Sequence, residues 1–207
     1  MFKKITLIVV IIVVAVLALL YKSDIPLNEL KEKYTNENSK FIPVMGMDVH
    51  YRDEGNKNDS VPLVLVHGTS SSLHTWDGIV PALTDKKRVI RFDLPAFGLT
   101  GPSMDRDYSI AFYNKFIDSL LVKLGVKQYA IAGNSLGGSI AWNQALTYPD
   151  KVKQLILVNA GGYPKKNEKG NIGFKLASMP VIGDVLVKFT PRALIRKSIE
   201  DVYSDKS

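Results

Sequence analysis

The pentapeptide Gly133-Asn134-Ser135-Leu136-Gly137 constrains this chain more than any other stretch of its sequence. Residues 128–132 before it are mostly apolar and predict a buried strand, and residues 138–146 after it predict a helix. A Gly-x-Ser-x-Gly sequence in that setting predicts a tight turn that holds the serine hydroxyl above a sheet. Side chains larger than glycine on either side of the serine would block this turn. The N–H groups at the start of the following helix point at a developing oxyanion. The alternative, a glycine-rich turn that happens to contain a serine, is disfavoured by the strand-turn-helix context.

The N-terminal residues 5–21 form an apolar run that is broken only by Thr6. A helix over this run is roughly 26 Å long, at the short end of what crosses a bilayer. Basic charge is concentrated before the run, which predicts a cytoplasmic N-terminus with the remainder on the periplasmic or extracellular side. A cleaved signal peptide is the alternative, but the only candidate cleavage site, Val16-Leu17-Ala18, is followed by two leucines. We therefore expect residues 1–22 to be an uncleaved, single-pass membrane anchor.

The composition excludes several classes of function. The chain has a formal charge of +7 and no cysteine, which excludes disulfides, thiolate metal sites and a cysteine nucleophile. Residues 23–162 carry equal numbers of basic and acidic side chains, so the excess charge lies in the two terminal segments. Nucleic-acid binding is therefore not expected. The sequence also lacks a phosphate-binding loop and a histidine cluster, and we expect no metal and no cofactor.

Strands alternate with helices through residues 40–162, after a polar linker at residues 23–39. We expect strands at 41–44, 47–52, 61–66, 88–92, 128–132 and 152–158, and helices at 77–83, 110–124 and 138–146. The continuous apolar run at 61–66 is typical of a central parallel strand. The alternation predicts an α/β fold, with a mainly parallel sheet and helices on both of its faces.

Loops at the carboxyl ends of these strands carry the other motifs. The strand at 61–66 ends in His67-Gly68-Thr69, and open α/β sheets bind ligands at such loops. The next strand is followed by Asp93-Leu94-Pro95-Ala96-Phe97-Gly98, and the last by Asn159-Ala160-Gly161-Gly162. His50 lies inside a strand, where we expect a surface residue or a cross-strand partner rather than a catalyst.

The order and spacing of these motifs, from about residue 40 to 164, resemble the α/β-hydrolase fold. Among its members the chain is similar to membrane-anchored, lipase- and esterase-like serine hydrolases with a helical cap. The resemblance implies that Ser135 is the nucleophile and that the backbone N–H groups of Thr69 and Leu136 form the oxyanion hole. It gives supporting roles to His67, Gly68, Gly133, Asn134 and Gly137. One departure is Ala96, where the family usually has glycine and where a methyl group is tolerable if φ is negative.

The resemblance stops after residue 164. In this family the catalytic acid and then the histidine follow the serine, but no histidine occurs after His74. None of the later acidic residues follows a strand at the carboxyl edge of the sheet, and two further strands are missing. This predicts a chain truncated within the cap. His67 and His74 both precede the serine, and we do not expect either to replace the base.

We expect hydrolysis of an ester or related acyl substrate through a Ser135 acyl-enzyme, with little or no activity in this truncated chain. Two alternatives stay open: a membrane-tethered binding module without turnover, and a carbon–carbon hydrolase or perhydrolase of the same fold. The last strand, 152–158, would be an uncovered apolar edge, through which the chain could self-associate. The expected domains are an anchor at 1–22, a linker at 23–39, a hydrolase core at 40–162 and the start of a cap at 163–207.

Overall fold

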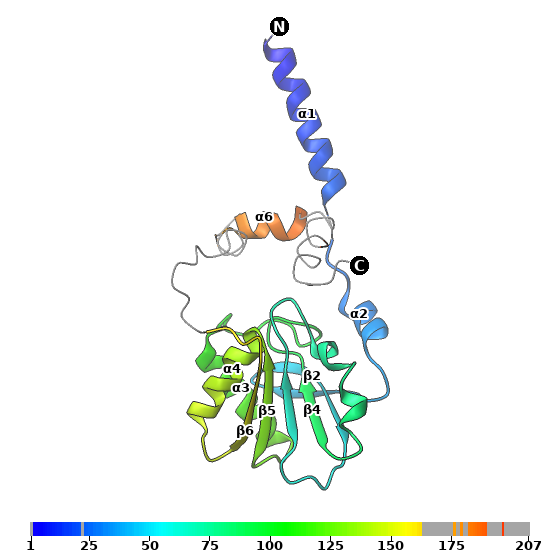
Figure 1. Ribbon diagram of the computed structural model, residues 1–207. Helices are drawn as coiled ribbons and strands as arrows, with labels where there is room; N and C mark the ends of the chain where they lie inside the picture. Colours follow the sequence, from blue (N-terminus) through cyan, green and yellow to red (C-terminus); the bar gives the residue numbers. More distant parts are fainter. Residues whose placement is uncertain are drawn as a thin grey trace, which may run out of the picture. The chain divides into compact units, whose positions relative to one another are not determined.

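The computed structural model describes residues 2–21, 23–162, 176, 179, 182–189 and 196. The chain divides into two compact units, of which one combines Met1–Ile25 with Lys165–Ser207 and the other is Pro26–Pro164. The second unit contains the sheet and all the motifs named above, and it is called the body here (Figure 1). The expected cap lies largely outside the described residues, although helix α6 (Ile182–Phe189) belongs to that segment.

Helix α1 (Phe2–Leu20) is formed by the N-terminal apolar run. Large apolar side chains are exposed along it, including Leu7, Ile11, Val14 and Leu19. No helix in the described part of the chain is long and apolar enough to cross a membrane. The single-pass anchor expected at residues 1–22 is therefore not confirmed.

The body is built on a six-stranded mixed sheet with the order β1-β2-β4-β3-β5-β6. The strands are β1 (Ser39–Val44), β2 (Met47–Gly55), β3 (Leu63–Val66), β4 (Arg88–Phe92), β5 (Tyr129–Asn134) and β6 (Val152–Val158). The four strands β3 to β6 run parallel to their neighbours among themselves, whereas β2 pairs antiparallel with both β1 and β4. Met45 and Gly46 both have positive φ, which is the geometry of a tight two-residue hairpin between β1 and β2.

One face of the sheet is covered by α3 (Ile110–Lys123) and α4 (Leu136–Thr147), and alternate strand residues such as Val64 and Val66 pack in that cluster. Leu65 and Val89 belong to a second cluster with Trp76 and Val80, which come from the 3-10 helices η1 (Leu73–Trp76) and η2 (Val80–Ala82). The helix expected at 77–83 is therefore wrong. Pro81 lacks the N–H that a continuing α-helix needs, and Gly78 is a poor helix former.

Strand β6 is an edge of the sheet, and its apolar side chains are open to solvent. Leu155, Ile156, Leu157 and Val158 are between 40 and 48% exposed. Successive residues of a strand point to opposite faces, so both faces of this edge carry exposed apolar surface in the described part of the chain. Self-association through β6 stays a prediction.

The turn after β4 differs from what the sequence led us to expect. Ala96 has a φ of 73°, in the left-handed region, so the expectation that a negative φ would accommodate its methyl group is wrong. This conformation costs an L-residue about 1–2 kcal/mol relative to glycine. The turn holds it through the Ala96 N–H, which donates to the carbonyl oxygen of Gly101 at 2.6 Å.

Candidate active site

Ser135 lies at the junction between β5 and α4, with a φ of 51° and a ψ of −114°. A non-glycine residue in such a conformation costs about 1–3 kcal/mol and persists only where its surroundings hold it. The Ser135 N–H donates to the carbonyl oxygen of Val158 at 3.1 Å, and the Ser135 carbonyl accepts from the N–H groups of Ser139 and Gly161 at 3.1 and 3.0 Å. The serine is exposed and its hydroxyl makes no capping bond to α4. The strained turn therefore presents a hydroxyl with no hydrogen-bond partner among the residues that the structure describes.

Close backbone contacts explain the glycines around this serine. A Cβ atom at Gly133 would lie 2.1 Å from the carbonyl oxygen of Gly137, and one at Gly137 would lie 2.2 Å from the carbonyl oxygen of Val66. A Cβ atom at Gly68 would lie 3.2 Å from the Ser135 Cβ. The loop after β3 is thus packed directly against the serine turn.

The two residues expected to supply oxyanion donors lie next to these contacts in the sequence. Leu136 is the first residue of α4, so its N–H has no acceptor within the helix. Thr69 is exposed and follows Gly68, which contacts the turn. The side-chain amide of Asn134 donates to the carbonyl oxygen of Val158 at 3.3 Å, which ties the turn to β6. Because β3 and β5 are parallel neighbours, the loops that carry Thr69 and Leu136 follow them at the same edge of the sheet; an oxyanion hole at these residues stays a prediction.

The buried ring of His67 joins two loops. Its Nδ1 lies 2.8 Å from the carbonyl oxygen of Gly68, and its Nε2 accepts the N–H of Leu94 at 3.0 Å. Nδ1 must therefore carry the proton and the ring is neutral. Burial lowers the pKa of His67 below its usual value. With both nitrogens occupied, this histidine has no atom available to deprotonate Ser135.

The other two histidines also have partners away from the nucleophile. His74 Nδ1 lies 2.9 Å from Asp77 Oδ2, and His74 Nε2 lies 3.0 Å from the carbonyl oxygen of Tyr34. His50 is completely buried, so a surface position for it is wrong. It is buried because β2 lies between β1 and β4, and its ring stacks on its cross-strand neighbour Phe41 at 5.0 Å.

Asp93 is the residue that sequence reasoning missed, because it was treated only as part of a turn. It is 1% exposed; its Oδ1 accepts the N–H of Leu73 at 2.8 Å, and its Oδ2 accepts the N–H of Leu99 at 2.9 Å. Oδ2 also lies 2.8 Å from His50 Nδ1. Gly98 leaves room for the carboxylate, since a Cβ atom there would lie 2.2 Å from it. An aspartate directly after a buried strand was the available signal.

Burial by itself would raise the pKa of Asp93, but hydrogen bonds from His50, Leu99 and Leu73 outweigh it and hold the pKa below its usual value. A carboxyl whose pKa is lowered on folding stabilises the fold above its unfolded pKa of about 3.9. That contribution is lost as the pH falls through the lower, folded-state pKa.

We expect Asp93→Asn to lower the free energy of unfolding at pH 7 by about 2–4 kcal/mol. In the same buried position, the neutral asparagine amide is a weaker acceptor than the carboxylate for the N–H groups of Leu73 and Leu99. The stability of the variant should also fall less steeply than that of the native protein between pH 5 and the acid limit, roughly pH 2. Urea unfolding at a series of pH values measures both effects. Asp85→Asn, at an exposed position, is the matched control; equal losses in the two variants would contradict the prediction.

Comparison with known proteins agrees with this geometry. The family model described as the alpha/beta hydrolase fold matches residues 61–178. The uncharacterized hydrolase YugF of Bacillus subtilis is 30% identical over 164 residues, which cover 79% of this chain and 59% of that protein. The human (lyso)-N-acylphosphatidylethanolamine lipase is 32% identical over 145 residues, which cover 68% of this chain and 42% of that protein.

Solved structures give the same result. A meta-cleavage product hydrolase from Pseudomonas fluorescens IP01 is 30% identical with a TM-score of 0.58, covering 63% of this chain and 48% of that one. Epoxide hydrolase A from Mycobacterium thermoresistibile, at 22% identity and a TM-score of 0.67, covers 81% and 57% and shows the fold alone.

A serine turn between strand and helix on a mixed α/β sheet defines a class of hydrolases. This chain belongs to the alpha/beta hydrolase fold family. The chain spans between 34 and 59% of the length of the curated relatives that it matches.

Proposed function

We propose that this chain carries the nucleophile of a serine hydrolase that acts on an ester or a related acyl substrate. The observation that carries the proposal is the exposed Ser135, held at positive φ directly before α4. Its Oγ would attack the acyl carbonyl, the N–H groups of Leu136 and Thr69 would bind the oxyanion, and water would release the acyl group. The likeness to a phospholipid lipase supports an acyl substrate.

At Ser135, these 207 residues alone should give little or no turnover. The sequence has no histidine after Ser135, and the rings of His50, His67 and His74 are bonded to other groups. A serine hydroxyl without a general base is a weak nucleophile at neutral pH. The likeness to a meta-cleavage product hydrolase keeps a carbon–carbon hydrolase open as a second candidate.

Covalent labelling tests the nucleophile. We expect a fluorophosphonate to modify Ser135 slowly in the folded chain, with the site located by peptide mass mapping. Ser135→Ala should remove that modification. Ser119→Ala is the matched control. Ser119 also carries a hydroxyl, but it lies outside the serine turn and donates to the carbonyl oxygen of Lys115 in its own helix. Modification of Ser135 at the same rate in folded and urea-unfolded protein would contradict the proposal.

We also propose that α1 attaches the protein to a membrane, with the N-terminus cytoplasmic and the body on the outer side. A helix that exposes large apolar side chains along its length gains free energy by burying them. We expect the full chain to sediment with membranes and to resist salt washing, and deletion of residues 1–22 to release the body. Recovery of the intact chain, with Met1 in place, from the soluble fraction would contradict this.

A further inference from the structure

Three side chains of the body, separate from Ser135, form a hydrogen-bonded series in the order serine, histidine, aspartate. Ser39 Oγ lies 3.0 Å from His50 Nε2, and His50 Nδ1 lies 2.8 Å from Asp93 Oδ2. The residues come from β1, β2 and the end of β4, which are neighbouring strands in the sheet. His50 and Asp93 are buried, whereas Ser39 is partly exposed.

The partners of Ser39 determine the direction of proton donation. Its Oγ accepts the backbone N–H of Asn36 and the Nε–H of Arg52, both at 3.2 Å. A serine oxygen has two lone pairs and one proton, so its remaining bond must be a donated one. His50 Nε2 at 3.0 Å is a nearer acceptor than Asn36 Oδ1 at 3.4 Å. Nε2 is then unprotonated and Nδ1 donates to Asp93, which is the arrangement that activates a serine nucleophile.

The positive charge beside Ser39 would stabilise negative charge on Oγ as its proton leaves. The guanidinium of Arg52 is held beside Oγ by Asp77 at 3.3 Å and by the carbonyl oxygen of Tyr34 at 3.4 Å. Once Oγ bonds to an acyl carbon it becomes an ester oxygen, which is a weak acceptor. The side-chain donor of Arg52 can then shift toward the adjacent carbonyl oxygen, where negative charge develops.

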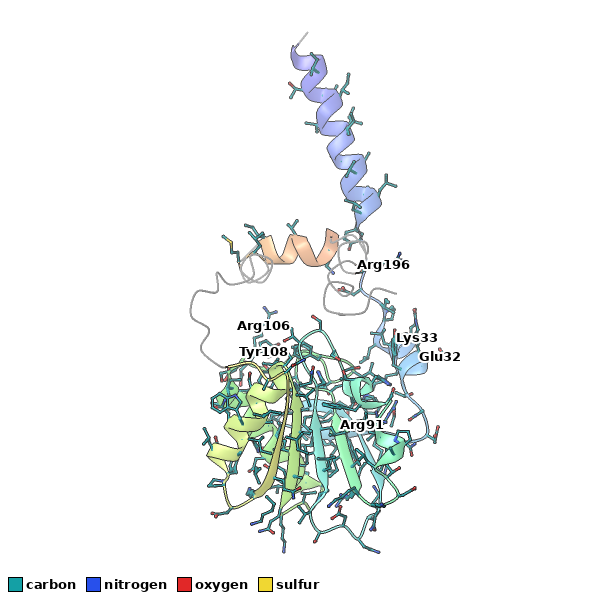
Figure 2. The ribbon with its side chains drawn as sticks, in the orientation of Figure 1. Glu32, Lys33, Arg91, Arg106, Tyr108 and Arg196 are labelled. Atoms are coloured by element: carbon teal, nitrogen blue, oxygen red, sulfur yellow. The ribbon has the colours of Figure 1, made fainter. Side chains whose placement is uncertain are left out.

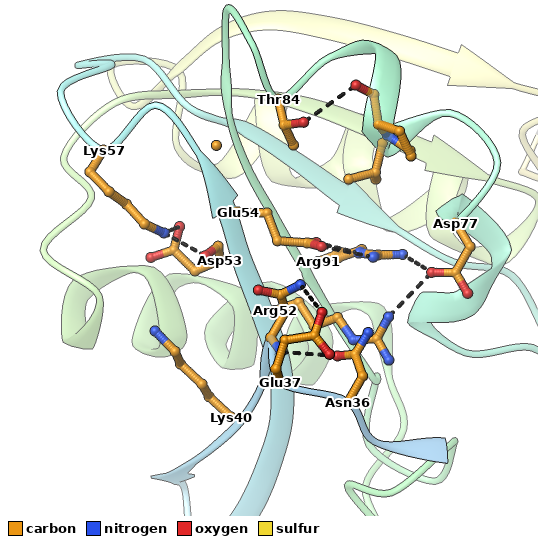
Figure 3. Close-up of a pocket in the computed structure, with 14 residues that line it drawn as sticks. Asn36, Glu37, Lys40, Arg52, Asp53, Glu54, Lys57, Asp77, Thr84 and Arg91 are labelled. Atoms are coloured by element: carbon orange, nitrogen blue, oxygen red, sulfur yellow. Dashed lines mark hydrogen bonds and ion pairs between the residues drawn. The ribbon is translucent and has the colours of Figure 1, made fainter. Parts of the chain in front are cut away.

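A pocket of about 760 Å³ is lined by Arg52, which also donates to Ser39 Oγ, although none of the three residues of the series is among its lining residues. Its wall includes Arg52 and the sequence neighbours of Ser39, namely Asn36, Glu37, Asn38 and Lys40. Figure 3 shows ion pairs from Arg52 and Arg91 to Asp77 at the same pocket. Arg91 lies on the sheet, whereas Glu32 and Lys33 project from α2 (Leu27–Tyr34) (Figure 2). Because charges of both signs line the pocket, it suits a small polar group and not a lipid chain.

We propose that Ser39, His50 and Asp93 form a second serine-nucleophile site, which takes esters with small, polar acyl groups. Ser39 Oγ attacks the carbonyl carbon while its proton passes to His50 Nε2. The bond to the alcohol oxygen then breaks, and the departing alkoxide takes that proton. Water hydrolyses the acyl-Ser39 ester, passing one proton through His50 back to Ser39 and releasing the acid. No step uses the Ser135 turn, so this site stands or falls separately from the proposed function.

The test uses the full chain with Ser135→Ala, purified in mild detergent, and diisopropyl fluorophosphate as the probe. Peptide mass mapping follows the modification of each serine in one sample. We expect Ser39 to react about 100-fold faster than Ser119, whose hydroxyl bonds only to the carbonyl oxygen of Lys115 at 2.7 Å. Ser39→Ala should remove the fast signal, and His50→Gln should slow it by about 100-fold.

Reaction of Ser39 no faster than that of Ser119 in the folded protein overturns the proposal. Fast reaction of Ser39 that His50→Gln leaves unchanged also overturns it, because the histidine would then not act as the base. Thermal unfolding shows whether His50→Gln is folded. If the His50→Gln variant is not folded, the ratio of the modification rates of Ser39 and Ser119 is the deciding measurement, because it requires no substitution within the hydrogen-bonded series.

Discussion

Hydrolysis of p-nitrophenyl acyl esters through Ser135 is expected to be about 10³- to 10⁶-fold slower in the 207-residue chain than in a complete serine triad. The residues of a triad act as a unit, so a correctly held serine gains little without its base. The rate that remains would come from substrate binding and from the proposed oxyanion donors, such as the N–H of Leu136. Release of nitrophenolate measures the rate, with Ser39→Ala as the background so that only Ser135 contributes.

An external base provides the control for this prediction. Imidazole should raise the Ser135-dependent rate, which is the difference between the chain and its Ser135→Ala variant, because it supplies the missing proton acceptor. Co-expression with a segment that supplies an acid and a histidine should raise it further if the two associate. Brisk turnover by the chain alone, lost in both Ser135→Ala and His74→Ala, would show instead that a histidine preceding the serine serves as base.

The sequence predicted the strands and the serine turn well because both depend on local patterns. The apolar run at 61–66 contains β3, and the expected strand at 152–158 has the bounds of β6. Ile110–Lys123 forms the helix that the spacing of apolar residues predicted. The Gly-x-Ser-x-Gly pattern places Ser135 between β5 and α4 because only glycine fits the close backbone contacts on either side.

Features that depend on residues far apart in the sequence could not be predicted in this way. The sequence pattern around His50 does not mark this polar residue as buried. It is buried because β4 inserts between β2 and β3 and encloses β2. The contacts of Asp93 join Leu73, Leu99 and His50, which only the sheet order brings together. The positive φ of Ala96 contradicts its own residue preference, and only the bond to Gly101 reveals why it is tolerated.

Gly137→Ala should destabilise the protein by about 3 kcal/mol, a large share of the 5–15 kcal/mol typical of a domain. Gly137 lies inside α4, where alanine by itself would favour the helix by about 1 kcal/mol. Its Cβ, however, would lie 2.2 Å from the carbonyl oxygen of Val66 and 2.5 Å from that of His67. These are backbone atoms of β3 and the loop after it, which have no rotamer to change. Helix α4 would therefore have to move away from the sheet.

Urea unfolding of the full chain, followed by circular dichroism, measures the loss as a lower midpoint with an unchanged slope. The matched control is Gly78→Ala, since a Cβ atom there would have nothing within 4 Å; its stability should change by no more than about 0.5 kcal/mol. Because α4 carries the Leu136 N–H, Gly137→Ala should also slow fluorophosphonate labelling of Ser135 in the fraction that remains folded. Equal midpoints for the two alanine variants would mean that the helix and β3 are not held in contact at this glycine.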